Sequence, residues 1–235
     1  MDRDNEVKTR RPRRSKADIE DAIHKAAVAQ IRKKGFSMAL VTDIVKRAKI
    51  EPIVFYNRYK NLDEFYDSFV KNYDYWLSDL IRANADNIST ESGFVEIFDK
   101  LIDKLMQDDI MAELLRWEIS DGNHITERTA RLRELHSVEL YGRYKRQLSG
   151  TNRDVSPLIT LIVGGIYFMV LHKDRSTFGG IDITTDDGRR QLTDAFKAFG
   201  RMVFHSREAD EAERIAERMR REGIPEEVIT RCLDK

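Results

Sequence analysis

The sequence predicts an all-α fold, in which a small N-terminal helical domain is followed by a larger helical domain. Only 12 glycines and 4 prolines occur in 235 residues, which leaves few positions for the many turns of an all-β fold. Apolar residues recur at helical spacing in segment after segment, and no pair of strands or internal repeat is recognisable. Residues 1–60 carry 16 Lys+Arg and 8 Asp+Glu. Because the whole chain has 41 of each kind, the remaining residues carry 25 Lys+Arg and 33 Asp+Glu.

The net charge is therefore +8 for residues 1–60 and −8 for the rest, which indicates that only the first domain binds a polyanion.

The composition favours a cytoplasmic protein. The single cysteine, Cys232, allows no internal disulfide, which favours a reducing compartment. The first residues, MDRDNEVKTRRPRR, lack the apolar stretch of a secretory signal. The longest apolar run, Leu158–Leu171, has 14 residues and suits a buried helix better than a membrane span.

The N-terminal part predicts a basic arm and then three helices. Six of the nine residues Lys8–Lys16 are basic, so residues 1–14 are expected to form a disordered arm. A first helix begins near Ser15 or Asp18 and ends at Gly35. A short second helix ends near Ala48. A third begins at Pro52, because proline suits the first helical turn, and runs to about Arg58. This domain is expected to cover residues 15–60.

The larger domain is expected to cover residues 61–205. Asn61 and Glu64 form a capping-box pattern that opens a long helix extending almost to Asn87. Further helices are predicted over 92–107, 110–120, 125–149, 155–173 and 189–205. Residues 206–235 are expected to form a charged helical tail of two short helices, broken at Gly223.

The stretch GFSMALVTDIVKRAKIEPIVFYNRYKNLDEF, Gly35–Phe65, carries a recognisable motif. It resembles the N-terminal signature of the tetracycline-repressor (TetR) family of transcriptional regulators. The matching elements are Gly35-Phe36, Asp43-Ile44, Ala48-Lys49-Ile50, Phe55-Tyr56, Tyr59 and Asp63-Glu64-Phe65. The resemblance implies a helix-turn-helix domain that binds double-stranded DNA, followed by a ligand-binding and dimerisation domain.

The third helix is the expected recognition helix. A helix-turn-helix leaves one face of its second helix free for the major groove. Ile44, Ala48, Ile50, Phe55 and Tyr59 supply the buried wedge, which leaves Pro52, Ile53, Val54, Tyr56 and Asn57 facing outward. By resemblance, Tyr56, Arg58 and Lys60 match positions that contact phosphates or bases, and Thr42 lies where the DNA backbone is gripped. The basic arm can reach a minor groove through Arg10, Arg11, Arg13 and Arg14.

Three residues depart from the family pattern. The turn glycine is replaced by Lys49, which must adopt an unfavourable backbone angle. Glu51 replaces the usual hydroxyl cap, and Leu62 replaces a phosphate-binding lysine. With Ile53 and Val54 in reading positions, we expect base readout through shape and methyl contacts.

Two functional regions are expected in the larger domain. The helix over 155–173 is apolar all round, which favours a dimer interface over simple core. The candidate interface residues are Leu158, Ile162, Gly164, Gly165, Phe168 and Met169. The resemblance implies a ligand cavity between about residues 62 and 150. Its candidate lining residues are Tyr73, Trp76, Phe98, Met106, Trp117, His136, Tyr141 and Tyr144.

The favoured interpretation is a ligand-responsive regulator, most simply a repressor that binds a palindromic operator as a homodimer. No catalytic residue, metal site or cofactor is predicted, because the five histidines are scattered and no HExxH motif or Cys-His cluster occurs. Two alternatives stay open: a DNA-binding adaptor without a ligand, which would have a fully packed second domain, and a helical enzyme.

Overall fold

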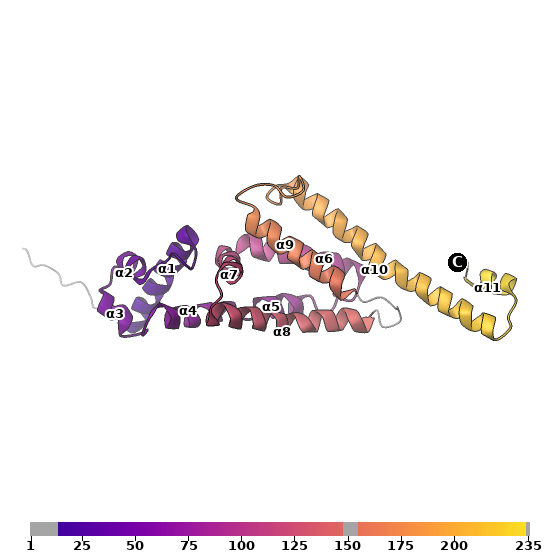
Figure 1. Cartoon of the computed structure of the whole chain (residues 1–235), viewed down its shortest axis with the longest axis horizontal. Coiled ribbons are helices and arrows are strands. Elements are labelled where there is room, and N and C mark those ends of the chain that lie inside the picture. Colours follow the sequence, from indigo (N-terminus) through magenta and orange to yellow (C-terminus); the bar gives the residue numbers. More distant parts are fainter. Residues whose placement is uncertain (1–13, 148–154, 234–235) are drawn as a thin grey trace, which may run out of the picture. The chain divides into compact units, whose positions relative to one another are not determined.

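The computed structural model describes residues 14–147 and 155–233, and all regular secondary structure in these residues is helical (Figure 1). The only strand-like feature described is one isolated bridge between Phe178 and Ile181. None of the described helices is both long and apolar enough to cross a membrane. The predicted all-α fold is therefore confirmed. The chain divides into two compact units, Met1–Phe69 and Val70–Lys235.

The first unit contains α1 (Lys16–Lys34), α2 (Val41–Ala48), α3 (Pro52–Tyr56) and nearly all of α4 (Leu62–Val70). Ser15 caps α1: its hydroxyl accepts from the Asp18 amide at 3.1 Å, and Asp18 accepts from the Ser15 amide at 2.9 Å. Asn61 accepts from the amide of Glu64 at 2.9 Å, as the capping pattern predicts. The carboxylate of Glu64 accepts from the amide of Lys60 rather than of Asn61.

An apolar core holds these helices together. It consists of Ile23, Ala26, Ala27 and Ile31 of α1, Ile44, Val45 and Ala48 of α2, Phe55 of α3, and Phe65, Tyr66 and Phe69 of α4. The hydroxyl of Tyr66 donates to the carbonyls of Phe36 and Ala39 at 3.1 and 2.8 Å, which fixes the α1–α2 connection on α4. The short helices are therefore oriented by a common core rather than by their own stability.

The second unit contains the remaining helices. They are the 3-10 turn η1 (Lys71–Tyr73), α5 (Trp76–Ala83), α6 (Glu91–Gln107), α7 (Asp109–Ser120), α8 (His124–Gln147), α9 (Ser156–His172), α10 (Asp186–Arg221) and α11 (Glu226–Leu233). Side chains of Thr90, Asp108 and Thr185 cap α6, α7 and α10. The helices predicted over 92–107, 110–120, 125–149 and 155–173 agree with α6 to α9 within two residues at each end.

Two helix predictions are wrong. The long helix expected from Leu62 almost to Asn87 is interrupted after Val70 by η1, and α5 begins at Trp76. Asp74, in this interruption, accepts from Arg128 of α8 at 2.8 Å, so a tertiary ion pair joins this segment to α8. The helix expected to end at 205 continues to Arg221. No glycine or proline occurs between Gly200 and Gly223, so nothing in that stretch breaks it.

α10 packs its N-terminal half against α6. Phe196 lies against Phe98 with ring centroids 5.4 Å apart, and Thr193 donates to Asp99 at 2.8 Å. Beyond this contact α10 extends to a turn at Gly223, where α11 folds back on its end (Figure 1). Ile229 is buried there, and Arg220 pairs with Glu226 at 2.8 Å.

Candidate nucleic-acid interface and ligand cavity

The turn between α2 and α3 is built around Lys49, which has φ 55° and ψ 51°. The amide of Ile50 donates to the carbonyl of Val45 at 3.2 Å, the bond that closes a helix end with a left-handed residue. Arg14 donates from Nη1 to the Ala48 carbonyl at 3.0 Å. The unusual backbone angle predicted for Lys49 is therefore present, and Arg14 serves as a cap for α2.

The short helix α3 is anchored on one side. Pro52 occupies its first turn, and Glu51 before it makes no side-chain cap. Phe55 is fully buried, with ring centroids 5.3 Å from Tyr59 and 5.6 Å from Phe65. Arg58 is half-buried and donates from Nη1 to the Val54 carbonyl at 2.9 Å. The buried ring fixes the rotation of α3 and so determines which residues face outward.

The outward face of α3 is apolar and aromatic. Ile53 is 63% exposed and Tyr56 is 50% exposed, while Pro52 and Asn57 are also exposed. Val54 is half-buried. This arrangement agrees with the outward face predicted from the sequence, except that Val54 is turned partly inward.

A group of exposed cations lies beside this face, at the end of α2 and after α3. Lys46, Arg47, Lys49 and Lys60 are all exposed. Thr42, at the start of α2, is exposed as well. Lys34 pairs with Asp43 at 2.7 Å and lowers the pKa of that carboxyl, so the acid of α2 stays charged and paired. Lys46, Arg47 and Lys49 were not among the predicted DNA-binding residues, although three cations within four residues around a turn could have indicated them.

The predicted DNA-binding arginines are not equivalent. Arg14 and Arg58 each donate to a helix-end carbonyl, so they order the turn and α3. Arg10, Arg11 and Arg13 lie outside the described residues.

The second unit contains a cavity of about 300 Å³ between α5, α6, α8 and α9. Its apolar wall is formed by Leu77, Leu80, Ile81, Ile97, Phe98 and Leu101. Its polar wall is formed by Arg133, Glu134, Ser137, Tyr141, Thr160 and Tyr167. The cavity thus has the amphipathic lining and the size that small-molecule sites have.

A buried ion pair supports the polar wall. Arg133 of α8 forms a bidentate pair with Glu118 of α7, in which Nη1 lies 2.5 Å from Oε2. Thr129 donates to the same carboxylate at 2.7 Å. Both charges are largely buried, so each compensates the desolvation of the other.

Only some of the predicted lining residues are brought together. Phe98 and Tyr141 line the cavity, whereas Tyr73 and Trp76 line a separate space of about 10 Å³. Four others line neither space: Met106, Trp117, His136 and Tyr144. Trp117 donates to Asp121, His136 lies against Tyr75, and Tyr144 packs on Phe94.

The lining residues of α8 other than Tyr141 were missed because they are not aromatic. Ala130, Arg133, Glu134, Ser137 and Tyr141 recur at spacings of three and four, which places them on one face of a helix. This spacing is visible in the sequence, but polar residues on one face of a helix usually indicate a face that is exposed to solvent.

α9 has one face in the core and one face outside it. Ile159, Ile162, Ile166 and Val170 are buried inside the unit. Leu161 is 74% exposed and Phe168 is 47% exposed. Gly164 lies between these two exposed residues, with nothing within 4 Å of the position of an added Cβ. Of the predicted interface residues, Ile162 belongs to the core, while Leu158, Gly165 and Met169 are half-buried.

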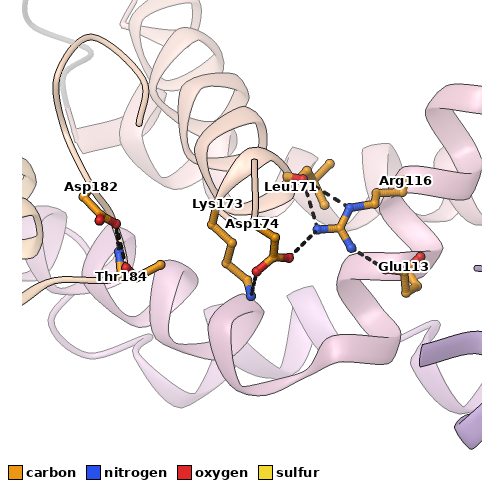
Figure 2. A network of polar contacts seen from close by, with 7 residues as sticks. All are labelled: Glu113, Arg116, Leu171, Lys173, Asp174, Asp182 and Thr184. Carbon is orange, nitrogen blue, oxygen red and sulfur yellow. Dashed lines mark hydrogen bonds and ion pairs between the residues drawn. The ribbon is translucent and has the colours of Figure 1, made fainter. Parts of the chain in front are cut away.

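The exposed face of α9 borders an open groove of about 650 Å³ that includes Ile119, Gly164, Phe168 and Leu171. Arg116 of α7 holds the C-terminal end of α9. Its Nε and Nη2 donate to the Leu171 carbonyl at 3.2 and 3.0 Å (Figure 2). Arg116 also pairs with Glu113 and lies 3.5 Å from Asp174. The C-terminal end of α9 is therefore held on α7.

The loop that leads from α9 to α10 has its own polar anchor. Asp182 accepts from the amide and the hydroxyl of Thr184 at 2.9 and 2.6 Å (Figure 2). These bonds lower the pKa of Asp182 and shape the turn before the cap residue Thr185.

Solved structures with a similar arrangement are transcriptional regulators. The fatty acid degradation regulator FadR from Bacillus halodurans is 18% identical and superposes with a TM-score of 0.55, covering 76% of this chain and 97% of its own. FadR from Bacillus subtilis, solved with stearoyl-CoA, is 17% identical with a TM-score of 0.54, covering 75% of this chain and 97% of its own. The chain has the fold of the FadR regulators.

A putative TetR-family regulator from Mesorhizobium loti is also similar, at 18% identity and a TM-score of 0.43, with 80% of this chain and 98% of its own covered. No protein-family model and no curated protein matches the sequence. The FadR likeness confirms the predicted two-part all-α architecture.

Proposed function

We propose that this chain is a DNA-binding transcriptional regulator that reads DNA with α3 and grips the phosphates with the cations around it. The observation that carries the proposal is the outward face of α3, where Ile53 and Tyr56 are exposed although Phe55 between them is fully buried. Exposed apolar and aromatic side chains on a five-residue helix, flanked by Lys46, Arg47 and Lys49, suit the thymine methyls and phosphates of a major groove.

The regulator is proposed to act as a homodimer through α9. Leu161 and Phe168 are exposed and lie about two turns apart on α9 with Gly164 between them, and together they form an apolar strip that a second copy can cover. Two recognition helices related by a twofold axis would bind a palindromic operator. Repression by occupying that operator in the cytoplasm is the simplest outcome.

The cavity of the second unit supports a sensor rather than a ligand-free adaptor, because an adaptor has no need of an internal space of about 300 Å³. FadR from Bacillus subtilis is seen with an amphipathic ligand, stearoyl-CoA. We propose an amphipathic small-molecule effector for this chain also. An enzyme has no comparable support, since the fold is that of regulators and the polar residues of the cavity include no catalytic motif.

Selection from random DNA duplexes tests the proposal. The intact protein should enrich a palindromic site, and Tyr56→Ala should weaken binding to that site by about 1–3 kcal/mol because a groove contact is lost. Tyr75→Ala is the matched control, since Tyr75 is also an exposed tyrosine and belongs to the second unit. Equal losses in both variants, or no enrichment by the unmodified protein, would show that α3 does not read DNA.

A further inference from the structure

The hydroxyl of Tyr167 is a polar group that has no hydrogen-bond partner in the described part of the chain. Tyr167 lies on α9, lines the cavity, and makes no hydrogen bond with another residue of the described ranges 14–147 and 155–233. Burial raises the pKa of Tyr167 to about 12, and the charged neighbours that act on it include Arg133 and Glu118. The phenol therefore stays protonated at neutral pH and can donate one hydrogen bond.

The neighbours of Tyr167 assign this residue to the wall of the cavity rather than to the outer groove. Tyr167 lines both spaces, but its neighbours Arg133 and Tyr141 line the cavity and not the outer groove. Tyr141 already shares a hydrogen bond with Thr160 at 3.1 Å, and Ser137 donates to the Glu134 carbonyl at 2.7 Å. Tyr167 is thus the hydroxyl of the polar wall that is left for a ligand.

The charges around the cavity argue against an anionic ligand. Both terminal nitrogens of Arg133 are engaged by Glu118, so the guanidinium charge is already compensated. Glu134 adds a further carboxylate to the lining. A ligand carboxylate would have to lose its hydration without gaining an unpaired cation.

The opposite wall is aliphatic, formed mainly by Leu77, Leu80, Ile81, Ile97 and Leu101. We propose that the cavity binds an uncharged amphiphile, an aliphatic chain that carries a carbonyl oxygen, and that this oxygen accepts a hydrogen bond from Tyr167. The inference rests on the proposed sensor function and names the chemical class of its effector.

Calorimetric titration of the intact protein with 2-decanone and with decanoate tests this inference. The ketone should bind about tenfold more tightly than the carboxylate, because the carboxylate must be desolvated beside Glu134. Tyr167→Phe, which removes only the hydroxyl, should weaken ketone binding about fivefold.

Tyr144→Phe is the matched control, because its hydroxyl is also without a partner but is sealed in the core of the same unit, away from the cavity. It should leave both affinities unchanged. Tighter binding of decanoate, an unchanged ketone affinity in Tyr167→Phe, or no binding of either probe would overturn the inference. Binding of duplex DNA is measured on the same preparations, so a protein that binds DNA but not the ketone fails in this inference alone.

Discussion

At the scale of single residues, the turn of the DNA-binding unit depends on Lys49. A left-handed conformation is unfavourable for any residue with a Cβ, and Lys49 is the only residue other than glycine with positive φ in the described part of the chain. The sequence predicted this strain because Lys49 stands where related motifs have glycine. Lys49 also adds a cation near the outward face of α3, which gives a reason for tolerating the strain.

Lys49→Gly should stabilise α2 by up to about 1 kcal/mol, because glycine adopts this conformation without a steric penalty. Hydrogen exchange of the α2 amides in the intact protein measures the change. Lys46→Gly removes the same charge from the same helix at a position with helical angles, and it should destabilise α2 by about 1 kcal/mol. If both variants lose stability equally, the left-handed turn does not carry the strain.

Individual cavity residues were the least predictable part of the site. Phe98 and Tyr141 could be recognised as aromatic candidates, but Trp117 and Tyr144 were indistinguishable from them in the sequence and lie elsewhere. Residue type indicates that a side chain can line a cavity. Which face of a helix meets the cavity is decided by tertiary packing, as for Tyr167.

At the scale of elements, the uniformly apolar helix α9 has one buried face and one exposed face. The helix was predicted to carry more apolar surface than the core of one protomer can bury. In agreement, Ile159, Ile166 and Val170 are buried, whereas Leu161 and Phe168 are exposed. The sequence could not distinguish the faces because apolar residues surround the helix. Ile162 was consequently placed in the interface although it belongs to the core.

Leu161→Glu should convert the proposed dimer to a folded monomer, because a carboxylate in the apolar strip would be buried without a partner. Sedimentation velocity at micromolar concentration, with circular dichroism as the check of folding, measures this. Leu135→Glu, at an exposed leucine of α8, should leave the dimer intact. A monomeric unmodified protein, or a dimer that persists in Leu161→Glu, argues against the α9 interface.

The interruption after α4 corrects the predicted continuous helix. Regular apolar spacing from Leu62 onward suggests one long helix, but spacings of three and four are also compatible with a helix, a 3-10 turn and a second helix. Asp74 in the interruption pairs with Arg128 of α8, the helix that also contributes Arg133 to the cavity wall.

At the scale of the whole molecule, the fold class and the order of the helices were predictable, because they follow from helical periodicity, caps and a low content of glycine and proline. The extent of α10 was not, since the charged segment after residue 205 resembles a separate tail. The division of charge, +8 in residues 1–60 and −8 in the rest, predicts that DNA binding by the N-terminal part depends on salt.

The proposed phosphate contacts are tested by the salt dependence of DNA binding. Lys46, Arg47, Lys49 and Lys60 are the exposed cations near α3 in each protomer. If both protomers of the proposed homodimer engage the enriched palindromic duplex, about eight phosphates are neutralised, and fluorescence anisotropy should give a slope of log affinity against log salt of about −7. Affinity should then fall about 2 × 10⁴-fold over a fourfold rise in salt. Absence of binding at low salt, or an affinity that salt does not change, would contradict the proposed DNA-binding function.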